Sequence, residues 1–181
     1  MTATTGTVVV RDVRPEDAER LGAAVAAAYV RDALLPADDP YVEVLRDVAG
    51  RLPDVVAVLA AYDGEEVLGG LTLVEAGTSH AEVALPGELE IRMLGVSPDH
   101  RRRGVAEALL RAAEERARAG GHIALVLSSM PAMTDAQRLY RRYGFVRVPD
   151  RDWLADWDPE ALADGTAERL SVYRLPLEDP R

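Results

Sequence analysis

The sequence predicts an α+β fold, layered α/β/α, in which a mixed central sheet of about seven strands is flanked by about four helices. Short apolar runs rich in β-branched residues alternate along the chain with segments of helical period. Two of these runs are separated by Asp63-Gly64-Glu65-Glu66, which is typical of an antiparallel hairpin. A later strand, helix, strand order requires a right-handed parallel crossover. The expected order is β-α-α-β-β-β-α-β-α-β-β.

The length and composition favour one soluble domain over residues 1–181, with its core between residues 8 and 175. The 31 acidic residues outnumber the 21 basic ones, which argues against nucleic acid or anionic membranes as partners. There is no cysteine, so disulfides, thiolate metal sites and an acyl-cysteine intermediate are excluded. His80, His100 and His122 share no ligand-like spacing, and we expect no metal. No leader and no long apolar run is evident, which favours a cytoplasmic location.

The N-terminal half reads as strand, helix, helix, strand, strand. Pro15 and the two acids after it suit the first turn of a helix. Val44, Leu45 and Val48 follow the helical period, and Pro53 ends that segment. The expected elements are a strand at 8–11, helices at about 15–29 and 41–51, and strands at 55–62 and 67–74.

The C-terminal half begins with a connecting loop at 76–88, where two Gly and a Pro interrupt any regular period. The most regular helix is expected at 104–119, rich in Ala, Leu, Glu and Arg and ended by Gly120-Gly121. The other expected elements are strands at 89–96 and 123–127, a short helix at 135–143, a strand from Phe145, an acidic and aromatic segment at 150–165, and a last strand at 170–175.

The sharpest local feature is Arg101-Arg102-Arg103-Gly104-Val105-Ala106, which lies between a strand and the start of the long helix. Free backbone N–H groups and the helix dipole at such a place favour a bound anion, and a pyrophosphate would fit. Gly104 permits close backbone approach, and the arginines add attraction. Neither the Walker lysine nor the GxGxxG pattern is present. On its own, the run could equally be a solvated helix start or a nucleic-acid patch.

At this point the sequence resembles the GCN5-related N-acetyltransferase (GNAT) superfamily. Arg101, Gly104 and Ala106 match its cofactor signature Gln/Arg-x-x-Gly-x-Gly/Ala. A second stretch, from Ala136 to Phe145, is similar to its Ala-x-x-Leu-Tyr-x-x-x-Gly-Phe element. The resemblance implies the GNAT acyl-CoA N-acyltransferase fold and an acetyl-CoA-dependent activity.

The resemblance also implies where acetyl-CoA binds. Family members hold the pantetheine arm where two parallel strands splay apart, here 89–96 and 123–128, through backbone groups near a bulge. That bulge maps to Leu94, Gly95 and Val96, and a glycine at 95 suits it. The pyrophosphate falls to the loop and helix start, namely Arg101, Arg102, Arg103, Gly104, Val105 and Ala106. Met133 stands where many members carry an asparagine beside the pantetheine, so one cofactor contact is missing from the pattern; hydroxyl or backbone groups of residues 128–131 are the candidates to replace it.

Two residues are candidates for proton transfer. Without cysteine, direct attack of the amine on the thioester in a ternary complex is the natural mechanism. Tyr140 matches the family's general acid, which protonates the CoA sulfur; its alternative is a core aromatic. Glu90 falls where several members carry a glutamate that takes the amine's proton through water. Strand alternation puts Glu90 and Arg92 on one face, so a solvent-facing ion pair is the alternative.

In the family, the acceptor pocket is built from the first two helices, their connection and the loop between the last two strands. From these segments we select Tyr29 and Trp153 as acceptor-binding residues. Acids beside aromatics would attract a cationic amine, whereas the alternative is a solvated acidic surface. The other candidates in these segments are Asp32, Asp38, Asp39, Tyr41, Asp150, Asp152, Asp156, Trp157 and Asp158.

The sequence therefore predicts an N-acetyltransferase that moves the acetyl group of acetyl-CoA to a primary amine of a small molecule or peptide. One alternative is a catalytically inactive acyl-CoA-binding sensor or interaction module, and another is an acyltransferase for a longer acyl-CoA. An acid at Glu90 and a phenol at Tyr140 favour the enzyme. A homodimer is one possible assembly, because many relatives pair through their C-terminal strands.

Overall fold

The computed structural model describes residues 7–155 and 159–177. Its strands are β1 (Val9–Asp12), β2 (Ala57–Asp63), β3 (Glu66–Glu75), β4 (Glu88–Val96), β5 (Ala124–Ser129), β6 (Val146–Arg147), β7 (Trp153–Leu154) and β8 (Arg169–Pro176). Its helices are α1 (Ala18–Arg31), α2 (Pro40–Arg46), α3 (Val48–Arg51), α4 (Val105–Ala119), α5 (Thr134–Tyr143) and α6 (Pro159–Asp164). None of these described helices is long and apolar enough to cross a membrane.

The strands form one mixed sheet, as predicted, in the order β1-β2-β3-β4-β5-β8-β6, with β7 paired to β8. The hairpin between β2 and β3 is antiparallel and β4 pairs with β5 in parallel. The predicted element order is confirmed with two additions, β7 and α6, inside the acidic aromatic segment. The predicted second helix is divided at Asp47, whose carboxylate accepts a hydrogen bond from the Gly50 backbone N–H at 2.8 Å and starts α3.

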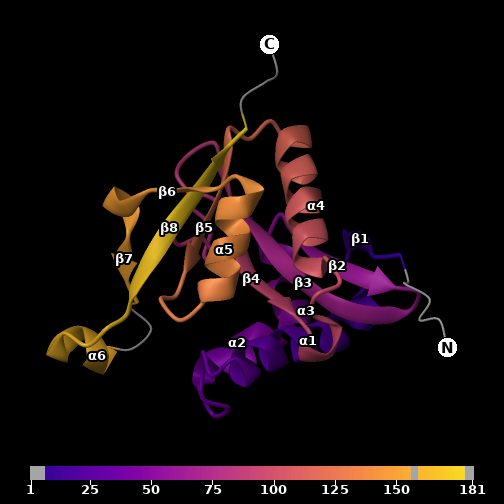
Figure 1. The fold of residues 1–181 in the computed structure, drawn as a ribbon, viewed down its shortest axis with the longest axis horizontal. Helices are drawn as coiled ribbons and strands as arrows, with labels where there is room; N and C mark the ends of the chain where they lie inside the picture. The colour runs from indigo at the N-terminus through magenta and orange to yellow at the C-terminus, as the bar shows by residue number, and fades with distance from the viewer. Residues whose placement is uncertain (1–6, 156–158, 178–181) are drawn as a thin grey trace.

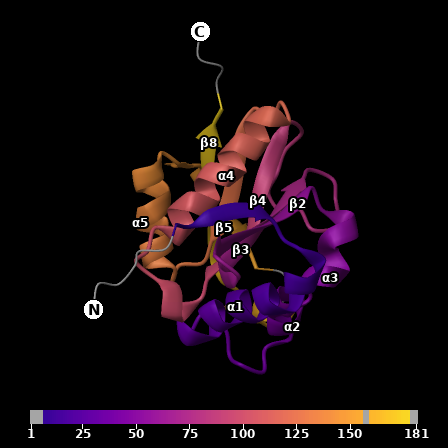
Figure 2. The same ribbon diagram turned by 90° about the vertical axis from the view of Figure 1, so that its right-hand side faces the viewer.

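Helices cover the sheet on two sides, with α4 and α5 on one side and α1 and α2 on the other (Figures 1 and 2). Strand alternation explains how both sides are apolar. On β2, Leu59 belongs to the core under α4, whereas Val58 and Tyr62 belong to the core under α1. A fully buried Val, Leu or Phe contributes about 1.5–3 kcal/mol, so each face holds its helices firmly.

The parallel strands β4 and β5 separate soon after they meet. Their pairing runs only from Glu88–Glu90 against residues 124–126, and beyond this point neither strand pairs with the other. The splayed strands inferred from the family resemblance are therefore present. The separation leaves the backbone of the second half of β4 without a strand partner on the β5 side. Such backbone groups are obligatory hydrogen-bonding groups and are available to a ligand.

The bulge in β4 lies one step before the expected position. Gly70 pairs with Gly95 and Thr72 pairs with Arg92, so two residues, Met93 and Leu94, oppose a single residue of β3. Met93 takes the left-handed conformation at φ +55°. Gly95 has a different reason to be glycine, because a Cβ there would lie 3.1 Å from the Cα of Val25 in α1. The expectation that Gly95 forms the bulge is corrected: its missing side chain lets α1 pack closely on β4.

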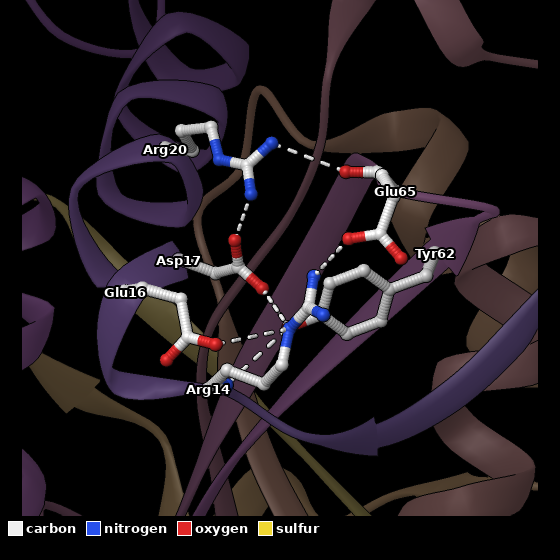
Figure 3. A network of polar contacts seen from close by, with 6 residues as sticks. All are labelled: Arg14, Glu16, Asp17, Arg20, Tyr62 and Glu65. Carbon is white, nitrogen blue, oxygen red and sulfur yellow. Dashed lines mark hydrogen bonds and ion pairs between the residues drawn. The ribbon is translucent and has the colours of Figure 1, made fainter.

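A polar network around the buried Asp17 fixes the start of α1 against the β2–β3 turn (Figure 3). Asp17 is fully buried and accepts hydrogen bonds from Arg14 at 2.6 Å, from Tyr62 at 3.1 Å and from Arg20. The two arginines also bind Glu65 in the turn. Burial by itself would raise the pKa of Asp17, but the three hydrogen bonds outweigh it and lower the pKa. The network therefore holds the helix that forms one wall of the site described next.

Candidate functional site

A cleft of about 550 Å³ lies where β4 and β5 separate, between α1, α5 and the start of α4. It brings together segments that are far apart in the sequence. Tyr29 comes from α1 and Tyr140 from α5. Eight of the nine predicted cofactor residues line it: Leu94, Gly95, Val96, Arg101, Arg102, Gly104, Val105 and Ala106.

The loop before α4 has the backbone shape of an anion site. Arg102 and Gly104 both adopt the left-handed conformation, with φ of +61° and +72°. Gly104 is the N-cap residue of α4, and a Cβ placed on it would meet no atom within 4 Å. A ligand can therefore approach the backbone at Gly104, and the first N–H groups of a 15-residue helix lie next to it. These features fit the pyrophosphate of a CoA molecule.

The three arginines of the loop have different surroundings. Arg101 forms a two-pronged ion pair with Asp32 at the end of α1, with N–O distances of 2.6 and 2.9 Å. Arg102 is exposed on the cleft and makes no hydrogen bond or ion pair with any residue that the structure describes. Arg103, however, does not line the cleft, because its guanidinium is bound to Asp63 at the β2–β3 turn. The prediction that Arg103 contacts the cofactor is therefore corrected: Arg103 supports the loop through its ion pair with Asp63.

Arg142 is a cleft residue that the sequence reasoning missed. It lies on α5 and faces the same cleft as Arg101 and Arg102. The sequence feature that could have identified Arg142 is its place two residues after Tyr140, inside the second family element. A third cation on the walls makes the cleft a better fit for an anionic molecule.

Tyr140 combines both roles considered for it. Its side chain is 5% exposed and its ring packs against Phe145 and Tyr173, with ring centroids 5.9 Å apart in each case. Tyr140 also lines the cleft, and its hydroxyl makes no hydrogen bond to a described residue and is not sealed from solvent. Burial, with a smaller effect from Tyr173, raises the pKa of the Tyr140 phenol. The phenol therefore stays protonated at neutral pH.

A smaller hollow of about 70 Å³ lies beside the cleft. It shares five wall residues with the cleft, so the two spaces are adjacent: Tyr29, Ile91, Met93, Ser128 and Met133. Both predicted acceptor residues, Tyr29 and Trp153, line it together with Tyr41 and Arg92. Met133, which replaces the family asparagine, therefore lies at the junction and offers a thioether, while Ser128 offers a hydroxyl.

The predicted acidic wall is absent from this hollow as far as the structure describes it. Asp32 lines the larger cleft but is paired with Arg101. Asp39 accepts the Tyr41 backbone N–H as the cap of α2, and Asp152 forms an ion pair with Arg147. Asp38 and Asp150 line neither space, and residues 156–158 lie outside the described residues. The expected attraction of a cationic amine by acids is therefore corrected, since Arg92 is the one charged residue on the walls of the hollow within residues 7–155 and 159–177.

Glu90 is fully buried and lines neither space. Its Oε2 accepts backbone N–H groups of Glu82, Val83 and Ala84 at 2.9–3.0 Å, which holds the β3–β4 loop against β4. Its Oε1 has no hydrogen-bond partner, and the Arg92 Nε lies 3.8 Å away. Burial raises the pKa of Glu90 despite these three hydrogen bonds and the Arg92 charge. The alternative of a solvent-facing Glu90–Arg92 pair is wrong, because the carboxylate has no exposed surface.

The described residues contain no group of three or more His, Asp or Glu side chains that could hold a metal ion. The arginines and backbone amides of the cleft are donors for an anionic organic molecule and are not metal ligands.

Solved structures with similar folds belong to acetyltransferases. One is an acetyltransferase of the GNAT family from Staphylococcus aureus, with a TM-score of 0.70 and 12% identity over 95% of this chain and 100% of that chain. Another is a GNAT family acetyltransferase from Brucella melitensis in complex with acetyl-CoA, with a TM-score of 0.63 and 19% identity over 97% and 92% of the two chains. A third is the PaiA N-acetyltransferase of Thermoplasma acidophilum in complex with coenzyme A, with a TM-score of 0.61 and 16% identity over 91% and 98%.

No curated protein sequence matches this chain. The family model of the acetyltransferase (GNAT) family, however, matches residues 23–145. This range contains the C-terminal part of α1, the splayed β4 and β5, the loop before α4 and Tyr140. The chain belongs to the GNAT family of acetyltransferases.

Proposed function

We propose that the protein is an N-acetyltransferase that moves the acetyl group of acetyl-CoA to a primary amine by direct attack in a ternary complex. One observation carries the proposal: a single cleft joins the stretch of β4 that has no partner on the β5 side, the open start of α4 and a buried tyrosine. A smaller hollow adjoins it, where the amine would enter. Acetyl-CoA supplies the activated acyl group as a thioester.

The backbone holds most of this substrate. The helix start at Gly104–Ala106 binds the pyrophosphate through N–H groups, and the charges of Arg101 and Arg102 assist it. Leu94, Gly95 and Val96 offer backbone groups to the pantetheine arm, and N–H groups of this stretch polarise the thioester carbonyl. Oriented donors of this kind need no rearrangement during the reaction, which is the source of their catalytic effect.

Protons move at two residues. As the amine nitrogen bonds to the acetyl carbon, the carbon–sulfur bond breaks, and Tyr140 donates its phenolic proton to the departing sulfur. Glu90 lines neither space, so it accepts the proton of the amine through a relay of water molecules, with Oε1 as the accepting atom because Oε2 already accepts three N–H groups. The products are an N-acetylated amine and CoA with a thiol. We place this reaction in the cytoplasm.

A thermal shift tests the cofactor site. The unfolding midpoint is measured with and without 1 mM acetyl-CoA for the wild type, for Gly104→Glu and for Gly121→Glu. Gly121→Glu is the matched control, because Gly121, just beyond the other end of α4, also has a left-handed φ of +73° and no atom within 4 Å of an added Cβ. A ligand at about 100 times its Kd stabilises the folded state by roughly 2.7 kcal/mol, so we expect a shift for the wild type and for Gly121→Glu. We expect none for Gly104→Glu, because the added side chain and its negative charge occupy the place of the pyrophosphate.

Thiol release in the presence of amines then tests catalysis. Turnover with acetyl-CoA supports the enzyme, whereas a thermal shift without turnover on a broad amine panel supports an inactive acyl-CoA-binding module. Faster turnover with a longer acyl-CoA would show that the transferred group is that longer acyl group and not acetyl. No thermal shift for the folded wild type would overturn the proposal.

A further inference from the structure

The small hollow beside Tyr29 and Trp153 has walls that match a particular kind of amine. Its one charged wall residue, within the part of the chain that the structure describes, is Arg92. From this we infer that the acceptor is a small amino acid, acetylated on its amine, with its carboxylate bound by Arg92 and Tyr41 and an apolar side chain. The inference rests on the proposed function and adds to it the chemical class of the acceptor.

Arg92 is positioned to bind a carboxylate. Its side chain is 14% exposed, and its Nη1 donates to the His80 carbonyl oxygen at 2.6 Å and lies 3.2 Å from Glu82. These contacts hold one edge of the guanidinium to the β3–β4 loop. Nη2 has a single contact, a long one of 3.4 Å to the Tyr41 hydroxyl, and both residues line the hollow. A guanidinium nitrogen with two N–H bonds and one long hydrogen bond retains donor capacity for a carboxylate.

A second buried cation lies near the same walls. Arg51 is 4% exposed and interacts electrostatically with Tyr29 and Tyr41. No carboxylate among the described residues lies within 4.0 Å of its guanidinium. Its hydrogen bonds go to hydroxyl and carbonyl oxygens, which are those of Thr72, Val44, Leu45 and Asp47. Asp47 acts electrostatically on Arg51 but forms no direct ion pair with it, and a buried charge without such a pair is costly, so an anionic group nearby is favoured and a cationic one is disfavoured.

Two carboxylates, those of Glu82 and Glu90, lie beside Arg92 and offset its charge, but neither belongs to the hollow. Glu82 is on the loop side of Arg92, and the Oε2 of Glu90 is occupied by three backbone N–H groups. Neither residue lines the hollow. The group that a ligand meets there is the guanidinium of Arg92, beside the hydroxyl of Tyr41.

The remaining walls and the size of the hollow define the rest of the acceptor. Met130, Met133, Leu170 and Trp153 present thioether, aliphatic and aromatic surface. The volume of about 70 Å³ is far below the roughly 300–1,000 Å³ of drug-sized ligand sites. The hollow therefore suits a few heavy atoms with apolar surface and does not suit a polyamine, whose second cation would meet Arg92.

The first test compares three acceptors of one shape. Turnover of acetyl-CoA is measured with leucine, with leucinamide and with 3-methylbutylamine, and spermidine serves as the cationic acceptor. Leucinamide replaces the carboxylate by a neutral amide, and 3-methylbutylamine lacks it. The amine of leucinamide is less basic and more often neutral, so a preference for leucine runs against amine reactivity. We expect kcat/KM for leucine to exceed that of each analogue by about tenfold or more.

The second test uses variants of the carboxylate site. Tyr41→Phe removes one hydroxyl, and we expect the ratio of kcat/KM for leucine to that for 3-methylbutylamine to fall about threefold to tenfold. Arg92→Met should lower the leucine value further, and Arg92→Lys should restore part of it. Tyr143→Phe is the matched control, since Tyr143 lines neither space. If Arg92→Met fails to fold, Tyr41→Phe decides the matter.

The outcomes separate this inference from the proposed function on which it rests. A leucine preference that Tyr41→Phe weakens, with the acetyl-CoA thermal shift retained, supports the inference. Equal or faster turnover of 3-methylbutylamine or spermidine overturns it and leaves the acetyltransferase standing, as does absent turnover of leucine when other amines react. Absence of both the thermal shift and any turnover rejects both proposals.

Discussion

Two tyrosines three residues apart on α5 should respond in opposite ways to the same substitution. Tyr140 lines the cleft, and its hydroxyl makes no hydrogen bond to a described residue. Tyr143 lines neither space, and its hydroxyl donates to Glu114 at 2.6 Å. Replacing either residue with phenylalanine keeps the ring and removes one oxygen. The pair therefore separates a hydroxyl needed for chemistry from one needed for stability.

The magnitudes follow from these contacts. Loss of a positioned general acid lowers kcat by about 10²–10⁴-fold, so Tyr140→Phe should raise the barrier by roughly 2.7–5.5 kcal/mol. Its stability should change by less than about 1 kcal/mol, because no protein hydrogen bond is lost. Tyr143→Phe loses a hydrogen bond to a partly exposed carboxylate, which costs about 1 kcal/mol of folding free energy after solvent screening, with kcat unchanged.

The assay combines initial rates of thiol release at saturating acetyl-CoA with denaturant unfolding of the same samples. The wild-type rate should also show no loss through deprotonation of Tyr140 up to moderately alkaline pH, because burial raises the pKa of that phenol. Full kcat in Tyr140→Phe, with the acetyl-CoA thermal shift retained, would refute its assignment as the general acid. Equal losses of kcat in both variants would indicate damage to α5 instead of a chemical role.

Three further predictions concern the supports of the site. Asp17 has a lowered pKa, so its contribution to stability should be complete above the ordinary value of 3.8 and disappear as the pH falls below it; unfolding of the wild type and Asp17→Asn, followed from pH 7 to pH 2, should converge in acid. Glu90→Gln keeps an oxygen for the loop N–H groups but no base, so the acid limb of the wild-type pH–rate profile, which rises through a pKa above 4.5, should be lost; an unchanged limb would exclude Glu90 as the base. Gly95→Val adds atoms beyond a Cβ already 3.1 Å from Val25, so the melting temperature and acetyl-CoA binding should both fall, whereas a stable variant with normal binding would contradict the close approach of α1 to β4.

The elements that could be predicted are those whose signals are local. A helix start needs few neighbours in the sequence, and the turn before α4 is visible from Gly104 and the regular segment after it. The continuous apolar runs of β2 and β3 likewise identify strands with both faces buried. The family motifs then predicted nine cofactor-binding residues, and the structure brings eight of these nine together in the cleft.

Glycine was harder to interpret, because its absence of a side chain has more than one use. At position 95 the expected use was the bulge, and the actual use is the close packing of α1. The bulge lies at Met93 and Leu94, and Met93 has a positive φ that its side chain would ordinarily disfavour. Nothing in the local sequence shows which residue of a strand faces a helix that starts about 75 residues earlier.

Charges were harder still. The alternation of β4 placed Glu90 and Arg92 on one face but could not show that the β3–β4 loop would fold over that face and bury the carboxylate. Asp39 and Asp152 lie in segments that surround the acceptor hollow, yet both are occupied by partners elsewhere. Which charge remains available to a ligand depends on pairing across the fold, and the charged residue that lines the hollow, in the part of the chain that the structure describes, is basic.

The loop before α4 shows how a backbone angle decides such pairing. Three identical side chains follow one another in the sequence, but Arg102 has a left-handed φ of +61°, so the chain changes direction between Arg101 and Arg103. Arg101 therefore reaches Asp32 on α1, and Arg103 reaches Asp63 at the β2–β3 turn. Ion pairs on both sides fix the loop before any ligand binds. The N–H groups at the start of α4 are thus oriented in advance, which lowers the entropic cost of binding a pyrophosphate.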